Sequence, residues 1–278
     1  MAIDYSIVFE CEPKRHFGQG DCARGTLAIL EALKSRNRAA ALRQMIEKSG
    51  KDPATAVVRL QVHDQDGNPI EKETTLADLE AHGRMLIHKG MLCTGCPANF
   101  LGQPYGCFGA VNYPIPENGE TWLLSRLQPF GTVGAQMCLD YIKEFKITGE
   151  SVLKLRRSGF FEAKSTPTLV VKKSLFSRIS VTSDQLLQTI LHVGNPLVPG
   201  HCFGLLLWLG AIRVDDKIPT ELNDQVGLFA LGTPQAKQQH TQLEIGDQSG
   251  EAGVIAFQTL VTAFYLCWLL DVPLWISP

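Results

Sequence analysis

The sequence GVIAFQTLVTAFYLCWLL, residues 253–270, carries no charged side chain over eighteen residues. A helix of this length and composition is long enough to span a membrane, so a carboxyl-terminal membrane anchor is one interpretation. Acidic residues flank the run, Glu251 before it and Asp271 after it, and Gln258 and Thr262 place polar groups on one side of the helix. Lipid is a poor environment for such a polar stripe. We therefore expect this helix to lie inside a protein core, with the membrane anchor as the alternative.

Strand and helix patterns alternate along the rest of the chain. Residues 4–12 alternate apolar and polar side chains, which is the period of a strand with one buried face, and Cys11 falls on the buried side. Asp21 is a typical helix cap, and the helix after it is expected to run toward Ser49. A second strand is expected over residues 56–62. We predict a mixed fold, α/β or α+β, in which helices pack on a mixed sheet.

The composition is that of a folded protein. The chain has 278 residues, of which 45% are hydrophobic and 19% charged, so it can form a substantial core. Its first residues lead directly into the strand pattern and lack the basic and apolar segments of a secretory signal. We therefore expect a cytoplasmic protein. In that reducing compartment its eight cysteines stay as thiols, which favours metal binding or thiol chemistry over a disulfide framework.

The composition shifts after residue 148. We predict a boundary there between two α/β regions, residues 1–148 and 149–278, with one compact domain as the alternative. Residues 150–180 hold seven Lys or Arg side chains against two Glu. A solvated basic face is the ordinary explanation, and contact with an anion or a nucleic acid is the alternative. The net charge of −2 gives no general attraction to nucleic acids or to anionic membranes.

The stretch RMLIHKGMLCTGCPANFLGQPYGCFGAVNYPI, residues 84–115, forms a Cys-rich and Gly-rich knuckle between helical segments. It holds Cys93, Cys96 and Cys107 within fifteen residues, and His88 lies just before them. In a C-x2-C pair the chain reverses between two thiols, so both can reach one ion, and a glycine between them permits the necessary backbone conformation. We therefore predict a metal site at these three cysteines.

The sequence leaves the fourth ligand of that site open. His88 is the first choice, which gives the pattern H-x4-C-x2-C-x10-C, and Cys22 or Cys11 are the alternatives. Zinc takes four sulfur and nitrogen donors, whereas a [4Fe–4S] cluster is held by thiolates, so the availability of His88 favours zinc over an iron–sulfur cluster. A structural or binding role follows. Two other interpretations compete, namely a redox-active or disulfide-bonded C-x2-C pair and inert buried thiols.

Cys22 is the candidate catalytic residue of an enzymatic alternative. It falls in the first turn of the helix expected after Asp21, where the helix dipole stabilises a thiolate. A nucleophile also needs a base within reach, for which His16 and His88 are available. The alternative function is thus a cysteine-dependent enzyme or a thiol redox protein that uses Cys22 or the C-x2-C pair.

Overall fold

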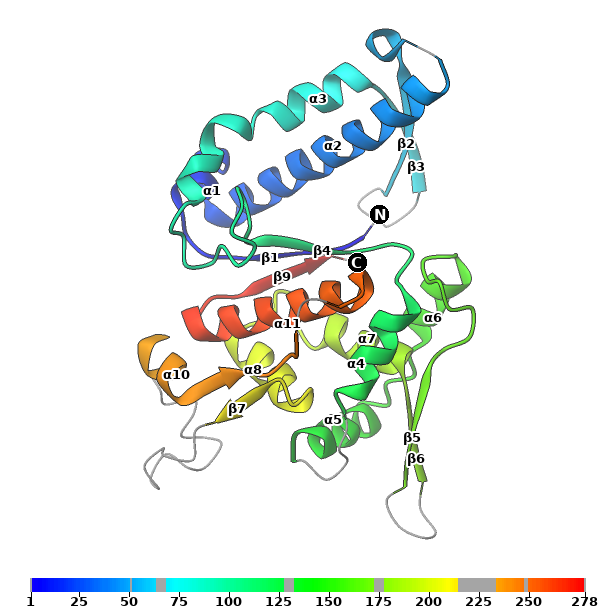
Figure 1. Ribbon diagram of the computed structural model, residues 1–278, viewed down its shortest axis with the longest axis vertical. Coiled ribbons are helices and arrows are strands. Elements are labelled where there is room, and N and C mark those ends of the chain that lie inside the picture. The colour runs from blue at the N-terminus through cyan, green and yellow to red at the C-terminus, as the bar shows by residue number, and fades with distance from the viewer. Residues whose placement is uncertain are drawn as a thin grey trace. The chain divides into compact units, whose positions relative to one another are not determined.

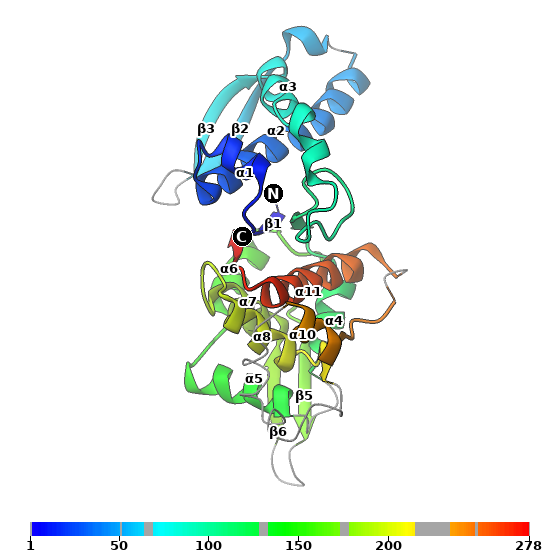
Figure 2. The same cartoon turned by 90° about the vertical axis from the view of Figure 1, so that its left-hand side faces the viewer.

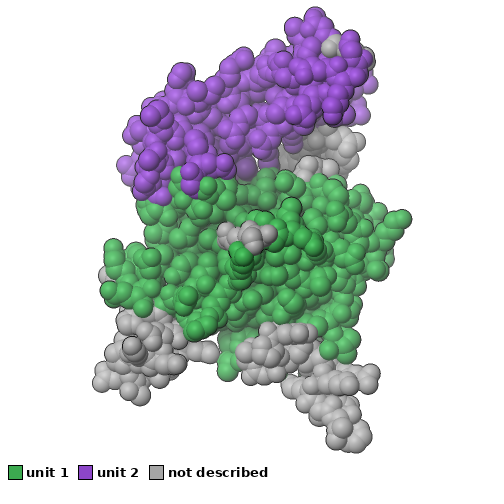
Figure 3. All heavy atoms as spheres, viewed as in Figure 1, with its two compact units in different colours: residues 1–9, 97–101, 106–278 green, residues 10–96, 102–105 purple. Residues whose placement is uncertain are grey.

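The computed structural model describes residues 2–50, 52–63, 69–127, 133–172, 178–214, 234–247 and 250–277. Helices pack with small antiparallel sheets, so the predicted mixed α/β class is confirmed (Figures 1 and 2). The chain forms two compact units (Figure 3). Unit 1 comprises Met1–Phe9, Pro97–Leu101 and Gly106–Pro278, and unit 2 comprises Glu10–Cys96 and Gly102–Tyr105. The boundary predicted after residue 148 falls inside unit 1.

Unit 1 contains a three-stranded antiparallel sheet. Strand β1 (Ala2–Ile7) lies in its centre, between β4 (Phe108–Asn112) and β9 (Leu274–Ser277). Tyr5, in the middle of β1, is buried and pairs with Gly109 on β4. The three strands come from distant parts of the sequence. The sheet is therefore complete only after β4 and then β9 have paired with β1.

Helix α11 (Ala252–Leu270) is the apolar helix expected from the sequence. It packs against helices α4 (Glu117–Ser125) and α8 (Pro199–Trp208) and against strands β1 and β4. By length and hydropathy alone it could span a membrane, and no other helix of the described residues meets that test. Gln258, in its polar stripe, is buried and donates to two backbone carbonyls at 2.8 and 3.1 Å. These are the contacts of a core helix.

The other described elements of unit 1 are helices and two antiparallel strand pairs. The helices are α5 (Val133–Glu144), α6 (Glu150–Arg157), α7 (Ser183–His192) and α10 (Pro234–His240). The strand pairs are β5 (Thr168–Lys172) with β6 (Arg178–Thr182), and β7 (Ile212–Val214) with β8 (Thr241–Leu243). Helices α6 and α10 and strands β7 and β8 are hard to predict from the sequence, because elements of this length give little periodic signal.

Unit 2 is built on the long helix α2 (Cys22–Lys48). Its N-cap is Asp21, as predicted, and the Asp21 carboxylate accepts hydrogen bonds from the first turn. Helix α3 (Leu76–Arg84) lies beside α2 in both views of the molecule (Figures 1 and 2). Thr75 and Asp78 form a capping box at the start of α3.

The remaining elements of unit 2 are short. They are α1 (Glu12–Phe17), the 3-10 helices η1 (Pro53–Thr55) and η2 (Ile87–Cys93), and the hairpin of β2 (Val57–His63) and β3 (Pro69–Thr75). A small apolar core joins α2, β2 and α3 through Ala39, Val58, Leu76 and Leu79. This core holds α2, the helix that begins at Cys22, against α3.

Candidate functional site

Cys11 does not lie on a strand, and the prediction of a strand over residues 4–12 is wrong at its carboxyl end. Strand β1 stops at Ile7, and Cys11 is the N-cap of helix α1, with extended backbone angles φ −149° and ψ 162°. Pro13 lies in the first turn of α1. Its fixed φ and missing N–H suit a helix start and do not suit a strand. Cys11 is therefore held at the beginning of a short helix.

Helix α1 packs unusually close to α2. The backbone carbonyl oxygen of Lys14 lies 1.7 Å from the position that a Cβ atom on Gly25 would occupy. Only glycine fits there, because a real Cβ would clash with that carbonyl. The Lys14 side chain is 1% exposed, which is rare for a lysine. The close contact fixes Cys11 and Lys14 against the helix that carries Cys22.

The C-x2-C pair lies on a tight turn at the end of η2. The Cys96 backbone N–H donates to the Cys93 carbonyl at 3.3 Å. Thr94 has φ −66° and ψ 127°, and Gly95 has φ +75°. These are the angles of a type II turn, which requires a positive φ at its third residue and so favours glycine there. The turn brings the two cysteines to its two ends.

Tyr105 closes over this turn from a separate segment of unit 2. Its hydroxyl donates to the Leu86 carbonyl at 2.8 Å, and its backbone N–H donates to the Cys93 sulfur. Burial raises the pKa of Tyr105 to about 12, so the hydroxyl stays protonated. No local pattern in the sequence points to Tyr105, because its contact with Cys93 depends on the return of the chain after Leu101.

Charge on Cys93 and Cys96 affects the pKa of neighbouring thiols, including that of Cys11. Burial raises the pKa of Cys11, the N–H and the charge of Lys14 lower it, and charge on Cys96 or Cys93 raises it further. Burial also raises the pKa of Cys93, the Tyr105 N–H opposes this, and charge on Cys96 adds to the rise. Three cysteines therefore share one electrostatic environment in unit 2, and Lys14 belongs to it.

The other predicted ligands of the metal site are Cys107 and His88. Cys107 is buried in unit 1, where its carbonyl accepts from the Ile7 backbone N–H at 3.0 Å. His88 is exposed on η2. Within the described ranges, no three or more His, Cys, Asp or Glu side chains are arranged so that they could hold a metal ion. The metal site at Cys93, Cys96, Cys107 and His88 therefore stays a prediction, and Cys11 is a further thiol that charge on Cys93 or Cys96 affects.

Cys22 is the first residue of α2 and is partly exposed. The Arg15 guanidinium donates to the Glu10 carboxylate and to the Cys22 sulfur, and these two contacts raise the pKa of Arg15. A guanidinium stabilises a thiolate but keeps its own proton, so it cannot act as the base. His16 lies exposed with its ring edge-on to Phe17. The Cys22 site is therefore a thiol beside a cation.

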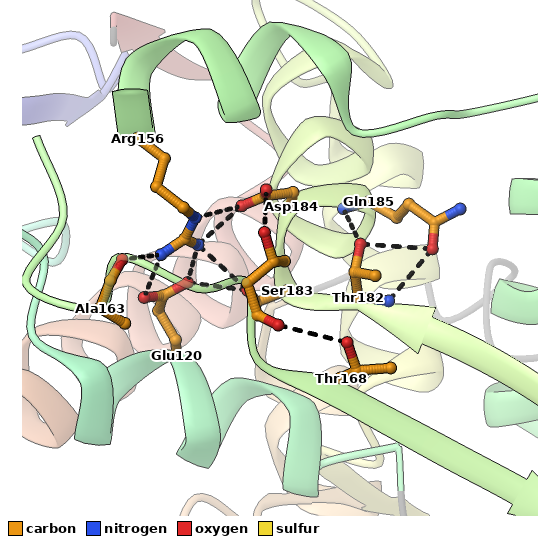
Figure 4. A network of polar contacts seen from close by, with 9 residues as sticks. Glu120, Arg156, Ala163, Thr168, Thr182, Ser183, Asp184 and Gln185 are labelled. Atoms are coloured by element: carbon orange, nitrogen blue, oxygen red, sulfur yellow. Dashed lines mark hydrogen bonds and ion pairs between the residues drawn. The ribbon is translucent and has the colours of Figure 1, made fainter. Parts of the chain in front are cut away.

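Unit 1 holds a buried network of charges (Figure 4). Arg156 on α6 donates to Glu120 on α4, to Asp184 on α7 at 2.7 Å, and to the Ala163 carbonyl at 2.8 Å. All three charged side chains are almost fully buried. Burial lowers the pKa of Arg156, and the two carboxylates more than reverse this. The network ties three helices together.

This network changes the interpretation of the basic segment at residues 150–180. Arg156 is enclosed and does not contribute to a basic surface. Lys154 is exposed but lies 3.7 Å from the Glu150 carboxylate, and Lys173 is outside the described residues. Arg157 and Lys164 are exposed. The segment therefore presents fewer unengaged cations than its composition indicates.

An open hollow of about 570 Å³ lies in unit 1, walled by α5, the turn after it, β6 and α7. Lys143, Lys146 and Gln185 line it together with apolar side chains. None of the cysteines or histidines singled out in the sequence lines this hollow. It is a separate feature from the thiols of unit 2.

Comparisons with known proteins add no family to these observations. The chain matches no protein-family model, and no curated protein or solved structure is significantly similar to it.

Proposed function

We propose that unit 2 binds one thiophilic metal ion through Cys11, Cys93 and Cys96, in a structural or binding role. The supporting observation is the grouping of these three thiols in one unit. Cys11 is close enough to Cys93 and Cys96 for a charge on either to affect it. Zinc is the first choice, because three thiolates and one further donor complete its tetrahedral shell. An iron–sulfur cluster held by thiolates is the alternative.

The protonation of the thiols supports metal binding over redox exchange. A reactive thiol needs a lowered pKa, as at a helix amino terminus, whereas burial raises the pKa of Cys11 and Cys93. The C-x2-C pair lies on a turn after η2, away from the start of a helix. A metal ion replaces the thiol protons outright, so raised pKa values weaken metal binding without preventing it.

Metal binding requires the side chains to come together, since they are not arranged as a ligand set. This coupling of binding to local ordering is usual for thiolate sites. The fourth ligand is proposed to be His88, the first choice from the sequence, which belongs to the same unit. Substitution of His88 tests this.

The test is elemental analysis and an absorption spectrum of protein purified without oxygen. We expect near-stoichiometric zinc, or iron with the visible absorption of a cluster. Cys11→Ser, Cys93→Ser and Cys96→Ser are each expected to lower the metal content. Cys22→Ser is the matched control, because it removes another partly exposed thiol from the same unit. Protein without either metal, or full retention of metal by Cys11→Ser and Cys93→Ser, would contradict the proposal.

Thiol chemistry at Cys22 is the second candidate function, and the contact with Arg15 favours it. A cation beside the sulfur and a position at the start of a helix both stabilise a thiolate. Cys22 is expected to react with iodoacetamide faster than the fully buried Cys267, and Arg15→Gln is expected to slow it. Mass spectrometry of labelled peptides measures both. Equal labelling of Cys22 in the parent protein and in Arg15→Gln would remove the support for this candidate.

A further inference from the structure

The hollow of unit 1 has an apolar wall and a cationic rim. Leu139, Ile142 and Val181 line it and are buried. Lys143 and Lys146 also line it, and both are exposed. Small-molecule sites combine a mostly apolar lining with a few polar groups, in cavities of roughly 300–1,000 Å³. The hollow, at about 570 Å³, has this size and this combination of side chains.

Lys146 holds a backbone conformation that usually belongs to glycine. Its φ is +50°, just beyond the end of α5. Its N–H donates to the Lys143 carbonyl at 3.2 Å, and the Ile147 N–H donates to the Ile142 carbonyl at 2.9 Å. These bonds end the helix in a Schellman motif, in which glycine is the usual residue at this position. A lysine kept in a strained conformation points to a use for its side chain, and this side chain lines the hollow.

The turn after α5 is held against α7. The Gln185 side-chain amide donates to the Ile147 carbonyl at 2.9 Å, and its oxygen accepts from Thr182 (Figure 4). A Cβ atom on Gly149, where φ is +79°, would lie 2.9 Å from the Gln185 backbone nitrogen. The turn therefore packs directly on the start of α7. The wall of the hollow is thus formed without a ligand, which limits the cost of ordering on binding.

The rim carries an excess of positive charge. In the part of the chain that the structure describes, neither Lys143 nor Lys146 forms an ion pair. Asp140 also lines the hollow, and the Gln136 amide donates to its carboxylate at 2.7 Å. Two ammonium groups and one carboxylate leave one positive charge. A ligand with a single negative charge balances it, whereas a dianion would meet repulsion from Asp140.

We propose that this hollow binds a small carboxylate with an apolar tail, such as a medium-chain fatty acid. The carboxylate pairs with the ammonium groups of Lys143 and Lys146, and the tail covers Leu139, Ile142 and Val181. Lysine stems are long and flexible, so both charged groups can reach one carboxylate. This site is independent of the metal site proposed in unit 2, because no cysteine lines the hollow.

The experiment is calorimetric titration of the full chain with octanoate, 1-octanol and acetate. Octanoate is expected to bind at one site. Acetate lacks the tail and is expected to bind at least about a hundredfold more weakly, and 1-octanol lacks the charge and is expected to bind about tenfold more weakly. Lys143→Gln and Lys146→Gly are each expected to weaken octanoate binding by about fivefold. Lys164→Gln removes an exposed charge of unit 1 outside the hollow and is the control, expected within about twofold of the parent protein.

Lys146→Gly gives a second, opposite readout. Glycine relieves the strain at φ +50°, so this variant is expected to unfold at a higher urea concentration while it binds octanoate less well. A residue with only a structural role would not change in these two directions. Lys143→Gln, at an exposed helical position, remains decisive if Lys146→Gly is unstable. The proposal is overturned if the parent protein does not bind octanoate, if 1-octanol binds equally well, if Lys143→Gln binds octanoate normally, or if Lys164→Gln loses as much affinity as Lys143→Gln.

Discussion

Gly95 is the residue on which the C-x2-C turn depends. With φ at +75°, an alanine there would be strained by about 1–2 kcal/mol. Gly95→Ala is therefore expected to lower the free energy of unfolding by about 1 kcal/mol and to weaken metal binding, because the two thiols lose their common turn. Denaturant unfolding measures the first effect, and elemental analysis of the purified protein measures the second.

Gly204→Ala is the matched control for that substitution. Gly204 lies inside helix α8, and no heavy atom is within 4 Å of an added Cβ. Alanine at this position is expected to stabilise the protein by up to about 1 kcal/mol, because glycine is the poorer helix former. Equal effects of the two substitutions would contradict a special role of Gly95.

The sequence predicted those features of the site that are local. Cys93, Gly95 and Cys96 lie within four residues, so their shared turn can be inferred from spacing. Lys14 and Tyr105 left no such signal, because they reach the thiols only through the packing of α1 and the return of residues 102–105 to unit 2. Cys11 is one of the possible ligands, but the sequence predicts it on a strand. Alternation of apolar and polar side chains over a few residues does not distinguish a strand from a helix cap.

At the scale of elements, Arg156 joins helices α4, α6 and α7. Arg156→Met is expected to lower the free energy of unfolding by about 3–5 kcal/mol, because it leaves Glu120 and Asp184 buried without a cation. Arg157→Met, at the exposed neighbouring position, is expected to change it by less than about 0.5 kcal/mol. Urea unfolding of the two variants tests this, and similar stabilities would show that the network contributes little.

Helices with a clear N-cap or a long apolar stretch were predictable from the sequence. Asp21 marked the start of α2, Thr75 with Asp78 marked α3, and the charge-free run marked α11. The six-residue helix α1 was not, because it completes too few turns to show a 3.6-residue period. The strand predicted over residues 4–12 therefore ran past Ile7 to Glu12, the first residue of α1.

At the scale of the molecule, metal removal is expected to affect one unit more than the other. The proposed ligands Cys11, Cys93 and Cys96 all belong to unit 2, so a chelator should loosen unit 2 and leave the core around α11 intact. Hydrogen exchange with and without chelator measures this. Faster exchange in η2 and α1 is expected, with α11 unchanged, and uniform acceleration in both units would contradict a site confined to unit 2.

Stability is also expected to fall at alkaline pH. Burial raises the pKa of Cys138 on α5 to about 12, whereas an exposed thiol has a pKa of about 8.5. Above about pH 8.5 the unfolded chain releases this proton and the folded chain keeps it. The unfolded state then binds fewer protons, so the free energy of unfolding decreases with pH, by about 1.4 kcal/mol per pH unit. Cys138→Ala should make the decline shallower in denaturant unfolding at successive pH values, and an unchanged slope would refute this.

The fold class was predictable from local patterns, whereas units 1 and 2 are defined by contacts between distant segments. Alternating helix and strand patterns identify a mixed fold, since each pattern is local. The composition shift near residue 148 is a change of surface charge inside unit 1. The division into units 1 and 2 depends on the pairing of β1 with β4 and β9. This pairing joins segments that lie more than a hundred residues apart in the sequence.

That pairing has a consequence for biosynthesis. A ribosome makes β1 first and β9 last of the three strands. All of unit 2 lies between β1 and β4 in the sequence, interrupted only by residues 97–101, which belong to unit 1. The sequence of unit 2 is complete once Tyr105 has been synthesised. The edge of β1 that pairs with β9 has no partner until Leu274–Ser277 emerge from the ribosome. Long-range pairing of this kind is slow and leaves strand edges open meanwhile. We therefore expect unit 2 to fold early during synthesis. One edge of β1 stays exposed for most of translation, and a chaperone could cover it.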